Sequence, residues 1–156
     1  MDILVFELAG HRFGVSIERV REVVRAVEIT PLPGAPQAVE GVIDVRGEVV
    51  PVFDLRARLG LGARRLHPDH HFVLAWARGR LAAMHVDRAR WMASVPDGEM
   101  ADARALAPHA EQITGVARMP DGLVLIHDLD LFLSPDEEAE LRSALEQREV
   151  PAAEGA

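Results

Sequence analysis

Residues 41–59 read GVIDVRGEVVPVFDLRARL, and the same pattern returns without gaps at residues 115–133, GVARMPDGLVLIHDLDLFL. A weaker match joins residues 14–19 to residues 83–88. A repeat of this kind indicates two copies of one structural unit. The chain is therefore predicted to hold two related halves, at about 1–66 and 67–134. Identical residues stand at these paired positions: Gly41/Gly115, Val42/Val116, Val50/Val124, Asp54/Asp128, Leu55/Leu129 and Leu59/Leu133.

Short strand-like runs separated by turn residues make up each half. Arg46-Gly47, for example, separates the apolar runs 42–45 and 48–53. Strands this short and so regularly interrupted favour small barrels over a parallel sheet. Hairpins are expected at residues 3–17, 42–53, 72–86 and 116–127.

Asp54 and Asp128 follow the two repeated hairpins and precede apolar segments. A carboxylate in this position satisfies unpaired backbone N–H groups, so both are predicted to be N-caps of helical turns. The alternative is a catalytic pair of carboxylates. Nothing in the sequence brings the two together, and that interpretation is much the weaker one.

A longer helix is predicted after the second copy. Ser134 to Glu137 provides a capping serine, proline at the first helical position and glutamate three residues after the cap. The helix is expected over 135–148, with a flexible tail at 149–156. Leu141, Ala144 and Leu145 form an apolar stripe, and Glu138 is spaced to pair with Arg142.

The composition is that of a soluble globular protein. The chain has 156 residues, 49% hydrophobic and 27% charged, and no cysteine. No apolar run approaches the roughly 18 residues of a membrane span, and the N-terminus lacks the pattern of a secretory signal. A cytoplasmic location is expected. The net charge of −8 shows no basic stripe for a phosphate backbone, so nucleic acid is not an expected partner.

The stretch 30–56 resembles the CheW-like domain, which is found in free-standing chemotaxis adaptors and in the regulatory domain of their partner kinase, CheA. Further matches lie at 4–6, 13–15, 20–23 and 115–133, so the resemblance covers nearly the whole chain. It implies one domain of two five-stranded SH3-like β-barrels with a C-terminal helix, at 1–148.

The resemblance also implies the function of a non-catalytic adaptor. Such a protein couples the cytoplasmic tips of methyl-accepting chemoreceptors to a CheA-type histidine kinase, without a cofactor or metal. A binding module in another pathway, including a motility system other than flagellar chemotaxis, is an alternative.

Candidate partner-binding residues follow from the family's coupling surface. Arg46 and Gly47 match its Arg-Gly tip. A guanidinium on a hairpin turn offers several donors to a partner's carboxylates, although a lone turn arginine is by default only solvated. The second copy has Pro120-Asp121 there, so the fold does not require Arg-Gly.

Val20, Glu22 and Gly41 also match positions near that surface. Core packing explains Val20 equally well, a special backbone angle explains Gly41, and ordinary surface charge explains Glu22. Asp44 replaces the family's usual asparagine, and its charge is expected to pair with Arg46.

The segment His67-Pro68-Asp69-His70-His71 supports a rival hypothesis, a zinc-dependent hydrolase using His67, His70 and His71. No general base or HExxH-like helix accompanies these histidines, so they are expected to be incidental surface residues.

Four further residues are assigned structural positions. His85 and His127 lie in strand patterns and are expected to be hydrogen-bonded or half-exposed. Trp76 and Trp91 are expected in the core, because the chain has only 4% aromatic residues to fill it.

Overall fold

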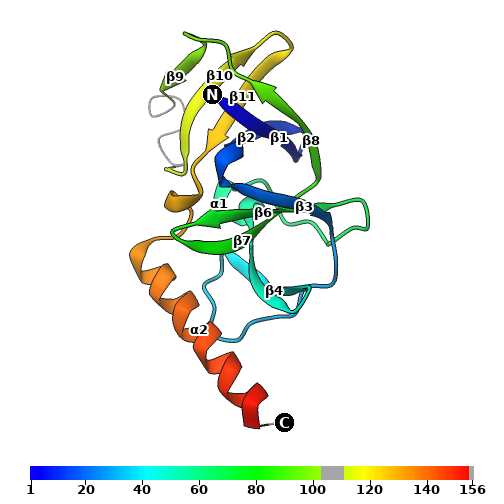
Figure 1. Cartoon of the computed structure of the whole chain (residues 1–156), viewed down its shortest axis with the longest axis vertical. Coiled ribbons are helices and arrows are strands. Elements are labelled where there is room, and N and C mark those ends of the chain that lie inside the picture. Colours follow the sequence, from blue (N-terminus) through cyan, green and yellow to red (C-terminus); the bar gives the residue numbers. More distant parts are fainter. Residues whose placement is uncertain (103–110, 155–156) are drawn as a thin grey trace.

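The computed structural model describes residues 1–102 and 111–154, which form two β-sheets and a C-terminal helix (Figure 1). The strands are β1 (Asp2–Leu8), β2 (His11–Ser16), β3 (Val20–Arg25), β4 (Val39–Val45), β5 (Glu48–Phe53), β6 (His71–Ala77), β7 (Arg80–Val86), β8 (Arg88–Ser94), β9 (Met100–Asp102), β10 (Ile113–Met119) and β11 (Gly122–His127). The helices are η1 (Ile17–Arg19), α1 (Leu55–Leu59), η2 (Leu129–Leu131) and α2 (Pro135–Glu154).

The strands divide into a six-stranded sheet, β8-β1-β2-β11-β10-β9, and a five-stranded sheet, β3-β6-β7-β5-β4. Figure 1 shows the six-stranded sheet at the top, the five-stranded sheet in the middle and α2 below. The predicted mainly β architecture with a C-terminal helix is confirmed. The sixth strand of the larger sheet is short β9, which pairs with β10 at Ala101 and Val116.

The internal repeat is visible in the strand register. The β4–β5 hairpin carries a bulge between Val39 and Gly41, and the β10–β11 hairpin carries one between Ile113 and Gly115. These are equivalent positions in the two copies. Asp54 and Asp128 are also equivalent, and each accepts a hydrogen bond as the N-cap of the turn that follows it. The predicted N-caps are therefore confirmed.

The two copies exchange strands. Val52 of β5 lies opposite Ala83 of β7 in a parallel pair, and Ile126 of β11 lies opposite Gly14 of β2 in the equivalent pair. Each sheet is therefore built from both halves of the sequence. The boundary near residue 66 separates the two copies along the chain but does not separate the two sheets.

The largest apolar cluster contains residues from both sheets and from α2. Phe53 and Phe132, one from each copy, stack with ring centroids 4.4 Å apart and planes 7° apart. Both side chains are fully buried, and such burial stabilises the fold by roughly 1.5–3 kcal/mol for each ring. The sheets are thus held together by a shared core.

α2 begins with the predicted capping box. The Ser134 hydroxyl accepts from Glu137 N–H at 3.1 Å, and the Glu137 carboxylate accepts from Ser134 N–H at 2.9 Å. Leu141 and Ala144 are buried in the core cluster, and Leu145 packs against it. The predicted apolar stripe is confirmed.

Two features of α2 differ from expectation. Glu138 forms an ion pair with Arg80 of β7 and not with Arg142, because α2 lies close enough to the sheet for a tertiary partner. The helix also continues past the predicted end at Arg148 to Glu154. Pro151 therefore lies inside α2 and does not end it.

The prediction that Trp76 and Trp91 are core residues is wrong. Their exposed fractions are 41% and 40%. Trp76 lies on the outward side of β6, and Trp91 lies beside a bulge on the outermost strand of its sheet. Phenylalanines fill the core instead, among them Phe6 and Phe72.

Within residues 1–102 and 111–154, no helix has both the length and the apolar character needed to cross a bilayer.

Candidate partner-binding surface

The β4–β5 hairpin ends in a two-residue turn, Arg46-Gly47. Both residues have left-handed backbone angles, with φ of 51° and 86°. This is the geometry of a type I′ turn, in which asparagine or glycine is preferred at the first position. A side chain as large as arginine costs roughly 1–2 kcal/mol in this conformation. Backbone preference therefore does not explain Arg46.

A second Arg-Gly turn, Arg78-Gly79, joins β6 to β7 with similar φ values of 50° and 76°. There the arginine has a structural role. Arg78 donates from its backbone N–H to the Asp130 carboxylate and from Nε to the Asp130 carbonyl, each at 2.7 Å. Asp130 lies in η2, outside the five-stranded sheet, whereas Arg46 pairs with Glu22 of the same sheet and is 67% exposed.

Arg46 is instead aligned by a row of alternating charges that crosses from the hairpin to β3. Arg46 Nη2 donates to Glu22 Oε2. The same oxygen accepts from Arg21 Nε at 3.3 Å, and Arg21 Nη1 donates to Glu48 at 2.8 Å. The sequence did not single out Arg21 or Glu48, because only the folded chain brings β3 beside the hairpin tip.

The charges in this row stabilise one another. The hydrogen bond from Arg46 is the main cause that lowers the pKa of the Glu22 carboxyl, and the bond to Glu22 raises the pKa of Arg46. Because water screens such exposed pairs, they contribute little to folding. Their effect is to orient the Arg46 guanidinium at the tip.

Asp44 does not pair with Arg46, contrary to expectation. Its carboxylate accepts from Gly47 N–H at 2.7 Å. An aspartate two residues before a tight turn readily bonds the turn's backbone in this way. Asp44 therefore holds the turn closed and leaves the guanidinium to Glu22.

Val20 and Gly41 lie at positions explained by packing. Val20 is half-buried at the start of β3 and packs against the core. Gly41 is buried in β4, where an added Cβ would lie 2.2 Å from the Thr30 carbonyl oxygen. Of the sequence candidates, the structure brings Glu22, Asp44, Arg46 and Gly47 together at the tip. We call these four, with Arg21 and Glu48, the tip surface.

Two exposed valines adjoin the tip surface in the chain. Val23 follows Glu22 and is 38% exposed, and Val49 follows Glu48 and is 48% exposed. Arginine is enriched in protein interfaces, and exposed apolar side chains beside it add area that a partner can bury.

The histidines of residues 67–71 do not converge on one point. His67 is exposed, whereas His70 is buried and contacts His85 with 2.7 Å between their ring nitrogens. His71 accepts from Ala89 N–H at 3.3 Å. Across the part of the chain that the structure describes, no three His, Cys, Asp or Glu side chains are grouped to hold a metal ion. The expectation of incidental surface histidines is wrong for His70.

His85 and His127 also differ from each other. His85 is buried and hydrogen-bonded, as expected of a strand histidine with a partner. His127 is buried with neither ring nitrogen bonded. Burial lowers its pKa to about 4.

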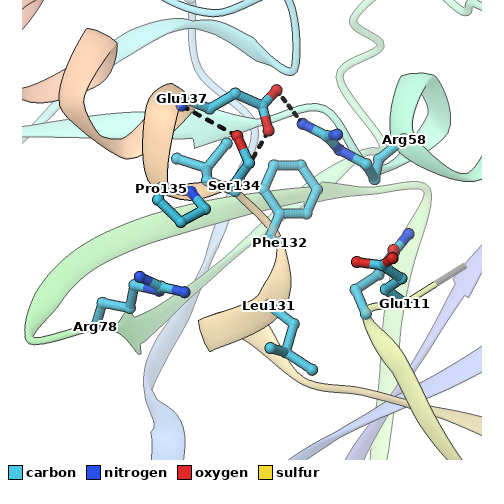
Figure 2. Close-up of a pocket in the computed structure, with 10 residues that line it drawn as sticks. Arg58, Arg78, Glu111, Leu131, Phe132, Ser134, Pro135 and Glu137 are labelled. Atoms are coloured by element: carbon cyan, nitrogen blue, oxygen red, sulfur yellow. Dashed lines mark hydrogen bonds and ion pairs between the residues drawn. The ribbon is translucent and has the colours of Figure 1, made fainter.

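An open cavity of about 440 Å³ lies beside the start of α2, and Figure 2 shows the residues that line it. Arg58 of α1 forms an ion pair with Glu137 there, and Glu137 is also bonded to Ser134. Phe132 lies between Arg58 and Arg78 in this view. The Arg58–Glu137 pair links α1 to the first turn of α2, so these two charged groups have a structural role.

The comparisons with known proteins all indicate one family. The family model described as CheW-like domain matches residues 2–137. A chemotaxis protein CheW of Rhizobium meliloti (strain 1021) is 30% identical over 141 residues, covering 88% of this chain and 91% of that protein. Protein FrzA of Myxococcus xanthus is 34% identical over 95 residues, covering 61% of this chain and 59% of that protein.

A solved structure shares the fold. The crystal structure of the scaffolding protein TtCheW from Thermoanaerobacter tengcongensis matches with a TM-score of 0.79 and 28% identity. The match covers 87% of this chain and 94% of that one.

Proposed function

The chain belongs to the CheW-like family, and from this we propose that it is a chemotaxis coupling adaptor that works by binding other signalling proteins. The observation that carries the proposal is Arg46. It occupies a strained turn position, is mostly exposed and is aligned by Glu22, in a chain whose family match extends over residues 2–137.

The chemistry of the tip surface favours a protein partner. The exposed guanidinium has donors beyond the one that Glu22 accepts, and these can bind a carboxylate or a backbone carbonyl. Arginine at an interface centre often contributes more than 1 kcal/mol to binding. Val23 and Val49 add exposed apolar area in the adjoining strands.

The partners we propose are the cytoplasmic tip of a methyl-accepting chemoreceptor and the regulatory domain of a CheA-type histidine kinase. Bridging them requires two surfaces, and the fold has two sheets that share one core. A rigid body of this kind can hold two partners at a constant distance. The adaptor role is non-catalytic.

The proposal can be tested by reconstitution. The purified chain is mixed with a receptor cytoplasmic fragment and a CheA-type kinase from the same genome, and complexes are measured by co-sedimentation and titration. We expect a complex containing all three. Arg46→Glu should weaken at least one of the two pairwise affinities tenfold or more, which is about 1.4 kcal/mol.

The matched control is Arg118→Glu. Arg118 is an exposed arginine of β10 on the six-stranded sheet, so the change in net charge is identical. Affinities should stay at the wild-type level in this variant. If the wild-type chain binds neither receptor nor kinase, the adaptor proposal is wrong. If both variants bind as wild type does, the tip surface is not the binding site.

A further inference from the structure

A row of polar groups, buried at its centre and half-buried at Glu40 and Asp87, runs from β4 to the turn between β1 and β2. Glu40 of β4 contacts His85 of β7, with 2.9 Å between carboxylate oxygen and Nδ1. His85 Nε2 lies 2.7 Å from His70 Nδ1. His70 Nε2 lies 3.9 Å from Asp87, whose other oxygen accepts from Ala9 N–H at 2.9 Å.

The two imidazoles at the centre are shielded from water. His70 is 3% exposed and His85 is 8% exposed. The Phe72 ring packs edge-on against His85, with centroids 5.4 Å apart. Water cannot readily replace a missing hydrogen bond here, so the hydrogens must be arranged by the groups themselves.

The contacts of the two imidazoles limit where their hydrogens can lie when Glu40 is ionised. The Glu40 carboxylate can only accept, so His85 Nδ1 must donate to it. His67 N–H donates to His70 Nδ1 at 3.3 Å, so this nitrogen must be an acceptor. His85 Nε2 must then donate to it as well, which leaves both nitrogens of His85 protonated.

A neutral pair fits the same geometry poorly. With His85 protonated on Nδ1 alone, His70 Nδ1 would have to carry the hydrogen that lies between the rings. That hydrogen would face the one on His67 N–H. His70 Nε2 would also turn a bare lone pair toward the Asp87 carboxylate.

We propose that Glu40, His85 and His70 together hold one proton more than an ionised glutamate and two neutral histidines, which makes this row a pH-sensitive junction. The extra proton belongs on His85, which lies between a carboxylate and a lone pair. His70 stays neutral with its hydrogen on Nε2, which is buried without a hydrogen-bond partner and lies 3.9 Å from the Asp87 carboxylate.

The surrounding charges are consistent with this assignment. Arg56 of α1 forms an ion pair with Asp87 at 2.7 Å, and Arg64 approaches it at 3.7 Å. Burial, followed by the charge of His85, lowers the pKa of His70, which agrees with a neutral His70. Asp87 opposes this effect, and Arg64 and His67 add to it. Glu40 is the carboxylate in contact with His85.

Loss of the extra proton would change hydrogen positions over several elements. His85 would stop donating to His70, and His70 would move its hydrogen from Nε2 to Nδ1. The contact between His70 and Asp87 would then become repulsive. Because Asp87 also binds Ala9 N–H, the change would reach the β1–β2 turn of the other sheet.

Nuclear magnetic resonance of the histidine ring nitrogens in the full chain tests the proposal without any partner. At pH 7 we expect hydrogens on both nitrogens of His85 and on Nε2 alone of His70. Raising the pH should remove the His85 Nε2 hydrogen and move the His70 hydrogen to Nδ1 in the same transition. A neutral His85 with hydrogen on Nδ1 alone at pH 7 would overturn the proposal.

Glu40→Gln supplies the second measurement. It keeps an acceptor for His85 Nδ1 but removes the negative charge, so the transition should move to lower pH. Glu28→Gln, at an exposed residue outside the row, should leave the transition unchanged. A transition at the same pH in Glu40→Gln as in wild type would count against the proposal. If Glu40→Gln does not fold, the wild-type spectrum alone decides.

Discussion

Arg58 and Phe132 stand at equivalent positions of the two sequence copies, and in the folded chain they contact each other. The Arg58 guanidinium carbon lies 5.4 Å from the centroid of the Phe132 ring. The same ring also stacks on Phe53, with 4.4 Å between the ring centroids. Phe132 of the second copy therefore packs against two residues of the first copy, Arg58 and Phe53.

Phe132→Ala should destabilise the fold strongly. The ring is 1% exposed, and removing a buried aromatic ring typically costs about 3–5 kcal/mol. Urea denaturation monitored by circular dichroism measures the free energy of unfolding. The neighbouring Leu131→Ala should cost much less, because Leu131 is 44% exposed. Similar losses in the two variants would mean that the ring is not central to the core.

Arg46→Asn is predicted to have opposite effects on stability and on binding. Asparagine suits the left-handed position of the turn, so the free energy of unfolding should rise by about 0.5–1 kcal/mol. Affinity for the partner that the tip surface binds should fall tenfold or more, because the guanidinium is lost. Denaturation and titration with the partner measure the two quantities.

Arg78→Asn is the control for that variant. It has the same turn geometry, but it loses the bond from Arg78 Nε to the Asp130 carbonyl. Its stability should therefore not rise as that of Arg46→Asn does, and its partner affinity should be unchanged. If Arg46→Asn were less stable than wild type and bound equally well, Arg46 would be a structural residue.

Gly41→Ala should be more destabilising than alanine at a turn glycine. The added Cβ would lie 2.2 Å from the Thr30 carbonyl oxygen, which is backbone and cannot turn aside. Gly10 also has positive φ, but a Cβ added there would meet no atom of the described chain within 4 Å, so Gly10→Ala should cost only about 1 kcal/mol. Thermal melting of both variants compares the two costs. Equal losses would show that the contact with Thr30 is relieved by movement of the chain.

Local features of the fold could be predicted from the sequence because they depend on neighbouring residues. Asp54 and Asp128 cap the turns that directly follow them, and Ser134 and Glu137 form a capping box within four residues. The duplication could also be predicted, because residues 41–59 align with residues 115–133. The exchange of strands was not, because hairpins of the same sequence can pair within one half or between halves.

Contacts between distant segments account for the errors at the candidate site. Asp44 is two residues from Arg46, yet the partner of Arg46 is Glu22 on β3. The sequence cannot decide between Asp44 and Glu22 as the partner of Arg46, because the answer depends on how the chain folds between β3 and β4. His70 was likewise expected to be an incidental surface residue, and its buried partner His85 lies 15 residues further along the chain, on β7.

The stability of the fold should depend on pH through His127. Its pKa is lowered to about 4 because the ring is completely buried, while in the unfolded chain the value is about 6.5. The unfolded state therefore binds the extra proton first as the pH falls. The contribution of His127 to the free energy of unfolding is therefore full above pH 6.5 and decreases between pH 6.5 and 4. Below pH 4 it no longer changes. The total loss is on the order of 3 kcal/mol.

His127→Leu isolates this contribution, since His70 and His71 also have lowered pKa values and add to the slope of the wild-type curve. Leucine is similar in size and removes two ring nitrogens that have no hydrogen-bond partner. Its stability at pH 7 should equal or exceed that of wild type, because an unpaired buried polar group is lost. The gap between the two unfolding free energies should then widen as the pH is lowered from 6.5 to 4. Parallel curves over that range would show that His127 gains a proton as easily in the folded protein as in the unfolded chain.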